Sequence, residues 1–127
     1  MSVITGLSRR ERQIMDILYQ RGKSSASEVR EAMPNRPSYS AVRAMLRVLE
    51  EKGHIGHEAE GLRYVYVPTV PREKAKRSAM KHLLNTFFND SPEQIVAALL
   101  DVGSARLTRE ELDRMAAMIE RAKREGK

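Results

Sequence analysis

Cysteine is absent from this 127-residue chain, and its absence excludes several kinds of site. Disulfides, zinc fingers and sensors that hold a metal through thiolates all require cysteine. Long apolar runs are also missing, since none approaches the ~20 residues that a membrane-spanning helix needs. The first residues, MSVITGLSRRERQ, lack the apolar core of a secretory signal. We therefore expect a cytoplasmic protein with no membrane partner.

Residue patterns of catalytic sites are missing as well. The chain has no Gly-rich phosphate loop and no nucleophile elbow, and its Ser and Asp residues stand mainly where helices are expected to begin. His54 and His57, with Glu58 adjacent, could bind a metal weakly. No further ligand has a fixed spacing to them, so a surface or capping role is favoured. We predict no enzyme activity, no metal site and no cofactor.

The composition is that of a folded, basic domain. Hydrophobic residues make up 41% of the chain and charged residues 31%, and 23 Lys and Arg against 17 Asp and Glu give a net charge of +6. This balance favours a polyanionic partner, although a basic protein without such a partner is the alternative. The excess of positive charge is shared equally by residues 1–70 and 71–127, so charge alone does not identify which half binds the partner.

Residues 38–53, SYSAVRAMLRVLEEKG, predict an amphipathic helix whose two faces differ in chemistry. One face is an apolar stripe at helical spacing, formed by Val42, Met45, Leu46 and Leu49. The other carries small residues and two guanidinium groups, namely Ser40, Arg43, Ala44 and Arg47. Such a face suits the negatively charged groove of DNA, because Arg can fork onto guanine or onto a phosphate. An ordinary surface helix would share this pattern, so the choice between a surface helix and a DNA-binding helix depends on the neighbouring segments.

Two shorter helices are expected before this one. Capping boxes that start at Ser8 and at Ser25 predict both helix starts, and Pro34 ends the second helix. A short turn containing Arg36 then leads into the helix at 38–53, whose N-cap is expected at Ser38. Three short helices with a tight connection between the second and the third form a helix-turn-helix layout.

Directly after this helix, the spacing of apolar residues changes from the helical period to the two-residue period of a strand. The arms 54–60 and 62–67 predict a β-hairpin, and a hairpin in this place forms a wing. Arg63 lies near its tip and is available to a phosphate or to the minor groove. Tyr64 and Tyr66 are expected to pack the hairpin against the helices rather than to stack on bases.

Pro68 and Pro71 mark the expected boundary between two domains, a DNA-binding domain over residues 1–70 and a helical dimerisation domain over residues 71–127. The second domain is predicted to hold three amphipathic helices. They cover residues 72–88, a segment that starts at Pro92 and ends before Gly103 and Ser104, and a segment capped at Thr108.

Three amphipathic helices outside a complete winged helix need an apolar surface on which to pack. A segment of this length has little core of its own, so we expect a homodimer that pairs the segment with its copy. The expected dimerisation residues are Leu83, Phe87, Ile95, Leu99, Leu112, Met115 and Ile119. The alternative is a segment that folds back on its own N-terminal domain.

The order of these features resembles the penicillinase-repressor family, which includes the methicillin-resistance and copper-operon repressors. The resemblance runs from Leu7 to Lys123. Its most specific parts are the helix at 38–53 with its Lys52 and Gly53 ending, the strand Tyr64, Val65, Tyr66 that runs into Pro68, and the helix start LTREEL at 107–112. The resemblance implies a winged-helix homodimer that binds a dyad-symmetric operator in double-stranded DNA and represses genes.

Departures from the family pattern limit what the resemblance implies. Ala41 and Ala44 stand where the family often has two threonines, and Tyr39 stands where a proline is usual, so the resemblance does not imply the family's operator sequence. Ala98 and Leu99 stand where a regulatory protease cuts an Asn-Phe bond in the antibiotic-resistance members. Induction by a protease therefore stays open, whereas copper sensing through C-terminal cysteines is excluded.

The sequence thus predicts a mainly α protein, with a winged helix-turn-helix (three helices plus a β-hairpin wing) followed by a helical C-terminal dimerisation segment. The expected DNA-binding residues are Ser38, Tyr39, Ser40, Arg43, Ala44 and Arg47, with Arg36 and Arg63 beside them. Two other functions stay open. One is a winged helix that docks on an acidic protein, and the other is a repressor that senses a small molecule or a metal through its helical segment.

Overall fold

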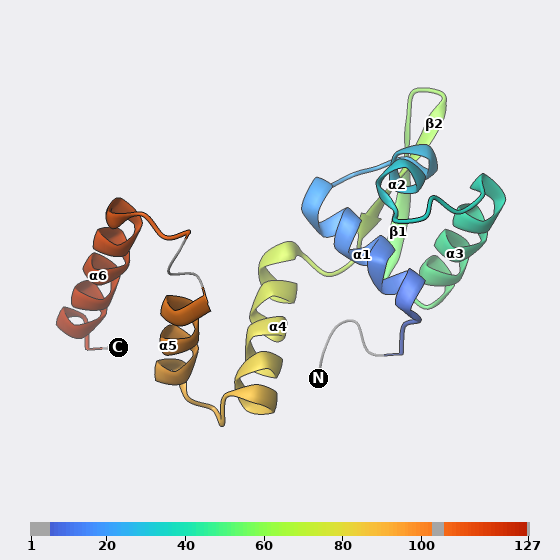
Figure 1. Cartoon of the computed structure of the whole chain (residues 1–127). Coiled ribbons are helices and arrows are strands. Elements are labelled where there is room, and N and C mark those ends of the chain that lie inside the picture. The colour runs from blue at the N-terminus through green and yellow to red at the C-terminus, as the bar shows by residue number, and fades with distance from the viewer. Residues whose placement is uncertain (1–5, 103–105, 127) are drawn as a thin grey trace. The chain divides into compact units, whose positions relative to one another are not determined.

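The computed structural model describes residues 6–102 and 106–126, which form six helices and one β-hairpin (Figure 1). In chain order the elements are α1 Arg9–Arg21, α2 Ala26–Ala32, α3 Tyr39–Glu51, β1 Ile55–Glu60, β2 Arg63–Pro68, α4 Arg72–Phe87, α5 Pro92–Val102 and α6 Arg109–Arg124. The mainly α winged-helix fold expected from the sequence is confirmed. None of these helices is long and apolar enough to cross a membrane.

Two compact units make up the chain, and the boundary between them lies between His82 and Leu83, inside α4. The first unit contains α1 to α3 and the hairpin, which gather around one core (Figure 1). This core consists of Ile14, Met15, Ile17, Leu18, Ala26, Val29, Met33, Val42, Leu46, Leu49 and Ile55. Burial of each large aliphatic side chain stabilises the fold by about 1.5 to 3 kcal/mol.

Capping boxes begin the first two helices, as predicted. The Ser8 hydroxyl accepts from the Glu11 backbone N–H at 3.1 Å, and the Glu11 carboxylate accepts from the Ser8 N–H at 2.9 Å. Ser25 and Glu28 repeat the arrangement at the start of α2. Each box satisfies two backbone donors that the first turn of a helix leaves without a partner. The cap of α3 is also confirmed, because the Ser38 hydroxyl accepts from the Ala41 N–H at 3.1 Å.

The hairpin has a two-residue loop, which sets its register. Glu60 pairs with Arg63, so the loop consists of Gly61, at φ +67°, and Leu62. Leu62 was expected to begin the second arm and instead lies in the loop, fully exposed. The prediction was wrong by one residue, because a positive φ at Gly61 closes the turn in two residues and leaves Leu62 unpaired.

An additional pair of backbone hydrogen bonds ties β2 to the segment before α2. The Tyr66 N–H donates to the Ser24 carbonyl at 2.8 Å, and the Ser24 N–H donates to the Tyr66 carbonyl at 3.3 Å. On the face opposite Tyr66, Val65 is buried to 1% exposure. The hairpin therefore has both backbone and apolar anchors on the helical core.

An ion pair joins the start of α1 to the end of α3. Lys52 Nζ lies 3.1 Å from Glu11 Oε1, and Glu11 is buried while Lys52 is exposed. The hydrogen bond from the Ser8 backbone N–H, aided by the neighbouring Lys52 ammonium, holds the pKa of Glu11 below its ordinary value of 4.5. A buried carboxylate with these donors stays ionised at neutral pH.

The helical segment differs from the core of the first unit. The predicted caps of α5 and α6 are present, since Ser91 Oγ accepts from the Gln94 N–H and Thr108 forms a capping box with Glu111. Among the described side chains of α5 and α6, none is buried. Gly103 and Ser104, which were expected after the second of the three helices, lie outside the described residues.

Replacement of Glu11 by Gln tests the link between α1 and α3. A group whose pKa is lowered on folding stabilises the folded state above the unfolded pKa, and this contribution is lost as the pH falls through the folded pKa. We expect E11Q to lower the free energy of unfolding by about 1 kcal/mol at about pH 7 and by less at about pH 3. Urea titrations followed by circular dichroism measure both values. E51Q, in an exposed carboxyl of α3, is the control, and a loss for E11Q that did not shrink at acid pH would contradict this assignment.

Candidate nucleic-acid interface

The two faces of α3 are as different in the structure as in the sequence. Val42, Leu46 and Leu49 are all at 0% exposure and hold one face against the core. The opposite face is exposed along its first half and carries Ser38, Tyr39, Ser40, Arg43, Ala44 and Arg47. The structure therefore brings six of the eight expected DNA-binding residues together on one exposed helical surface.

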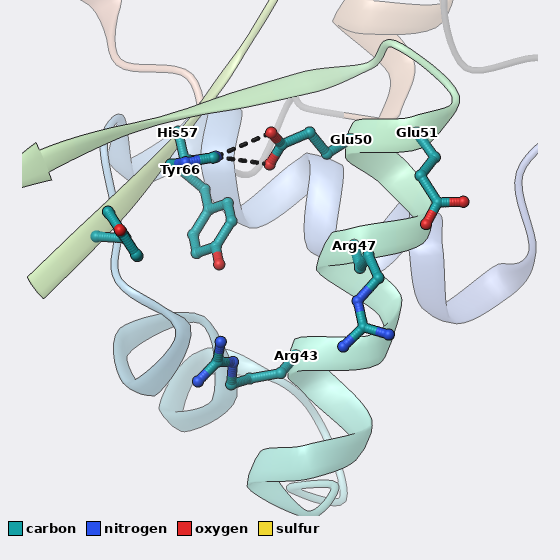
Figure 2. A pocket seen from close by; sticks show the side chains of 7 residues that line it. Arg43, Arg47, Glu50, Glu51, His57 and Tyr66 are labelled. Atoms are coloured by element: carbon teal, nitrogen blue, oxygen red, sulfur yellow. Dashed lines mark hydrogen bonds and ion pairs between the residues drawn. The ribbon is translucent and has the colours of Figure 1, made fainter.

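A hollow of about 350 Å³ lies between α3 and the hairpin, and we name it the arginine groove. Its lining residues are Arg43, Arg47, Glu50, Glu51, His57, Tyr64 and Tyr66 (Figure 2). A second hollow of about 470 Å³ shares Arg43, Tyr64 and Tyr66 with it and reaches the start of α2 and Arg63. The exposed face of α3 is thus continuous with a concave surface that the hairpin closes on one side.

Arg43 and Arg47 are the cations of this groove, and both side chains extend from α3 in Figure 2. The Arg43 guanidinium lies 5.9 Å from the centre of the Tyr39 ring, a cation–π distance. Neither arginine forms an ion pair with any residue in the described ranges. Their positive charge is therefore available to an external anion.

Arg36 and Arg63, the other two expected arginines, have acidic partners. Arg36 lies 3.0 Å from a Glu31 carboxylate oxygen. Arg63 lies at the hairpin tip, as expected, and its guanidinium is 3.3 Å from both Glu28 and Glu60. All of these side chains are exposed, and exposed ion pairs contribute little, typically about 0 to 1 kcal/mol. An incoming phosphate can therefore exchange with the carboxylates.

A contact between the hairpin and α3 crosses the arginine groove and was missed by the reading of the sequence. His57 Nδ1 lies 2.9 Å and 2.8 Å from the two carboxylate oxygens of Glu50 (Figure 2). The signal for it was the two-residue loop at Gly61, because this loop pairs His57 with Tyr66 and so places both on one face of the hairpin. His57 lies at the surface, with Glu50 as its partner.

Tyr64 and Tyr66 share one face of β2 but differ in burial. Tyr66 is half-buried and packs against the core, as expected. Tyr64 was expected to do the same, and this was wrong, because it is 57% exposed and contacts the His57 ring edge-on at 4.9 Å. Tyr64 lies nearer the hairpin tip and lines both hollows without packing on the core. Its ring is therefore available to a ligand.

Two further ion pairs link the hairpin to the segment around α2. Lys23 Nζ lies 2.9 Å from Glu58, and this hydrogen bond raises the pKa of Lys23. The Ser25 backbone N–H lowers the pKa of Glu28, the partner of Arg63. In the described ranges no cluster of His, Cys, Asp or Glu has the arrangement of a metal site. The lining of the two hollows consists of charged groups, hydroxyls and aromatic rings, which are the kinds of group that contact phosphates and base edges.

Comparison with known proteins gives a family match over residues 7–121, to the family described as penicillinase repressor. Among curated proteins, the penicillinase repressor of Bacillus licheniformis is 24% identical over 129 positions, which span 100% of this chain and 99% of that protein.

Solved structures add two similarities. The DNA-binding domain of the repressor BlaI is 26% identical with a TM-score of 0.48, over 56% of this chain and 89% of that one. A transcriptional regulator from Thermotoga maritima is 17% identical with a TM-score of 0.55, over 91% of this chain and 78% of its own. The likeness to the Thermotoga protein is one of fold.

The difference in burial between the two tyrosines predicts different effects on stability. We expect Y66A to lower the free energy of unfolding by about 1 to 3 kcal/mol, because it removes a ring packed on the core. Y64A, the matched control on the same strand face, should change it by less than about 0.5 kcal/mol. Urea denaturation measures both. An equal loss for the two variants would mean that Tyr64 is packed in solution, contrary to its place in the groove.

Proposed function

Since this chain belongs to the penicillinase-repressor family of DNA-binding transcription regulators, we propose that it is a repressor that binds a dyad-symmetric operator as a homodimer. The observation that carries the proposal is the exposed face of α3, with Arg43 and Arg47 free of acidic partners beside the hairpin. In this proposal α3, within the segment 38–53, enters the major groove and the hairpin over residues 54–68 contacts the DNA backbone.

The major groove of DNA is about 12 Å wide and accepts one α-helix. Ser40 and Ala44 are small, so they allow α3 to approach the base edges closely. Arg43 and Arg47 can each fork onto guanine O6 and N7 or onto a phosphate. Ser38 and Tyr39, at the start of α3, would contact the backbone at the groove edge.

Arg36 and Arg63 take backbone positions in the same proposal. Each is paired with exposed glutamates in the free protein. Phosphates accept charge-assisted hydrogen bonds from guanidinium as carboxylates do, and an exposed ion pair costs little to exchange. We therefore propose that these two arginines contact phosphates and fix the position of the protein on the DNA, and that they do not contact base edges.

Exposed apolar side chains of the helical segment support the dimer part of the proposal. Of the seven expected dimerisation residues, Leu83, Phe87, Leu99, Leu112 and Ile119 are between 37% and 70% exposed. Ile95 and Met115 are half-buried. A second copy of the segment would cover this surface, and the functional division we propose is 1–70 for DNA binding and 71–127 for dimerisation.

Induction and location follow from the same proposal. The repressor would act in the cytoplasm, where it meets its operator. The bond between Ala98 and Leu99 lies inside α5. A regulatory protease that cut there would first have to open the helix, because proteases act on locally unfolded backbone.

A mobility-shift titration against DNA from around the coding region tests the function directly. With excess random competitor and two salt concentrations, we expect a discrete complex that weakens steeply with salt and retains a preference of about 10³ or more over random DNA. The two half-sites should lie about 34 to 36 Å apart, or a multiple of this distance. If the complex disappeared when either competitor DNA or salt was added, only non-specific charge attraction would remain. This result would contradict an operator in this region.

Replacement of the two free arginines should remove most of the specific affinity. We expect R43A and R47A each to weaken operator binding by about 1 to 3 kcal/mol if the side chain reads a base. R109A, in an exposed position of α6, removes the same charge and is the control. Unchanged affinity of the R43A/R47A double variant would contradict the role of α3.

Charged substitutions in the apolar seam of α6 test the dimer. We expect M115D and I119D each to shift the protein to a monomer in sedimentation and to weaken operator binding, because two linked half-sites bind more tightly than one. A117D is the control, because helical spacing places Ala117 on the opposite side of α6. Intact dimers of both seam variants would show that the interface lies elsewhere.

A further inference from the structure

Glu50 is the acidic residue nearest along α3 to Arg47, and its carboxylate is held by the hairpin. Both of its oxygens lie within 2.9 Å of His57 Nδ1. A carboxylate only accepts hydrogen bonds, so Nδ1 is the donor in this contact. Figure 2 shows the carboxylate turned toward His57, with the Arg47 guanidinium on the side of Arg43.

We propose that His57 is a positioning residue for DNA binding, which keeps the Glu50 carboxylate away from Arg47 so that Arg47 retains its charge for the DNA. The inference rests on the proposed function of α3. It assigns to the hairpin a second role besides its own contact with DNA. That role is to control the charge of the recognition helix.

Helix geometry places two carboxylates within reach of Arg47. Residues three or four apart on a helix lie about 5 to 6 Å apart at their Cβ atoms, so both Glu50 and Glu51 have the spacing of an ion pair with Arg47. Arg47 forms no ion pair with any residue in the part of the chain that the structure describes. Without His57, Glu50 could turn to Arg47, neutralise it and place a negative charge toward the phosphates.

The His57 ring is itself fixed by aromatic contacts from the neighbouring strand. Its centre lies 4.9 Å from that of Tyr64, edge-on, and 6.1 Å from that of Tyr66. Both tyrosine rings thus pack beside the imidazole on the face of the hairpin that lines the groove. Glu51, which also lines the groove, has no ion pair within the described ranges and is not held in this way.

A double-variant cycle on operator DNA tests the proposal. H57F keeps a ring between the tyrosines and removes the nitrogen that holds Glu50. We expect H57F to raise the dissociation constant roughly fivefold and to lower the slope of log affinity against log salt by about 2 for the homodimer, because one cation in each protomer is neutralised. The dissociation constant of H57F/E50Q should lie within about twofold of that of E50Q alone, because the Glu50 carboxylate that could pair with Arg47 is gone.

Two further variants separate this role from simple support of the hairpin. E51Q removes one negative charge from the same face, and H57F/E51Q should remain as weak as H57F. In an R47A background, H57F should cause a smaller loss of affinity than in the wild type, because no Arg47 charge is left to neutralise. The proposal would be overturned if E51Q restored the DNA affinity of H57F as well as E50Q does. It would also be overturned if E50Q did not restore this affinity.

Folding and function are checked separately. Melting curves show whether H57F is folded. If it is not, H57A replaces it in the same measurements, with the same expected change in affinity. An operator complex of the wild type that weakens in R47A but is unaffected by H57F would refute the inference and leave the proposed function standing. Absence of a specific wild-type complex would refute the proposed function itself.

Discussion

The burial of three aliphatic side chains on α3 is the constraint on which the candidate interface depends. Val42, Leu46 and Leu49 are fully buried, so the rotation of α3 about its own axis is fixed by the core. Consecutive residues of a helix are about 100° apart around the axis, so a shift by one residue would turn these three side chains out of the core, and in one direction it would bring Arg43 and Arg47 into it. The loss of buried apolar area, and in that direction the cost of buried unpaired charge, disfavours such a shift. The core therefore decides which side chains α3 presents.

Pairing distinguishes the arginines of the first unit more sharply than net charge does. Arg36 and Arg63 have glutamate partners, whereas Arg43 and Arg47 have none in the described ranges. The excess of six positive charges is a property of the whole chain and attracts any polyanion. Selective contact with one DNA sequence needs cations that are both unpaired and rigidly directed. Only the surface of α3 combines the two conditions among the expected DNA-binding residues.

Local signals explain how much of the fold the sequence predicted. Helix starts at Ser8, Ser25 and Thr108 depend on side chains three residues away, and all three capping boxes are present. The apolar stripe of α3 needed only the helical period. The exposed position of Tyr64 depends on how far the helices extend beneath the hairpin. Such a distance between elements has no local signature, so the prediction for Tyr64 failed.

The candidate site was predictable to the same extent. Which residues lie on the outer face of α3 followed from periodicity. The link between Glu50 and His57 did not, because it joins two elements whose relative position depends on the hairpin register. The ion pairs of Arg63 have the same origin, since Glu28 is distant in sequence. Charges near an interface therefore need the tertiary structure before their availability is known.

The pairing of Ser24 with Tyr66 has a consequence for the thermodynamics of recognition. An isolated two-stranded hairpin is at best marginally stable in water. Here the two backbone hydrogen bonds to Ser24 and the burial of Val65 give this hairpin partners before any ligand arrives. Its conformational entropy is lost when the protein folds and not when it associates. A preorganised wing of this kind leaves more of the contact free energy to appear as affinity.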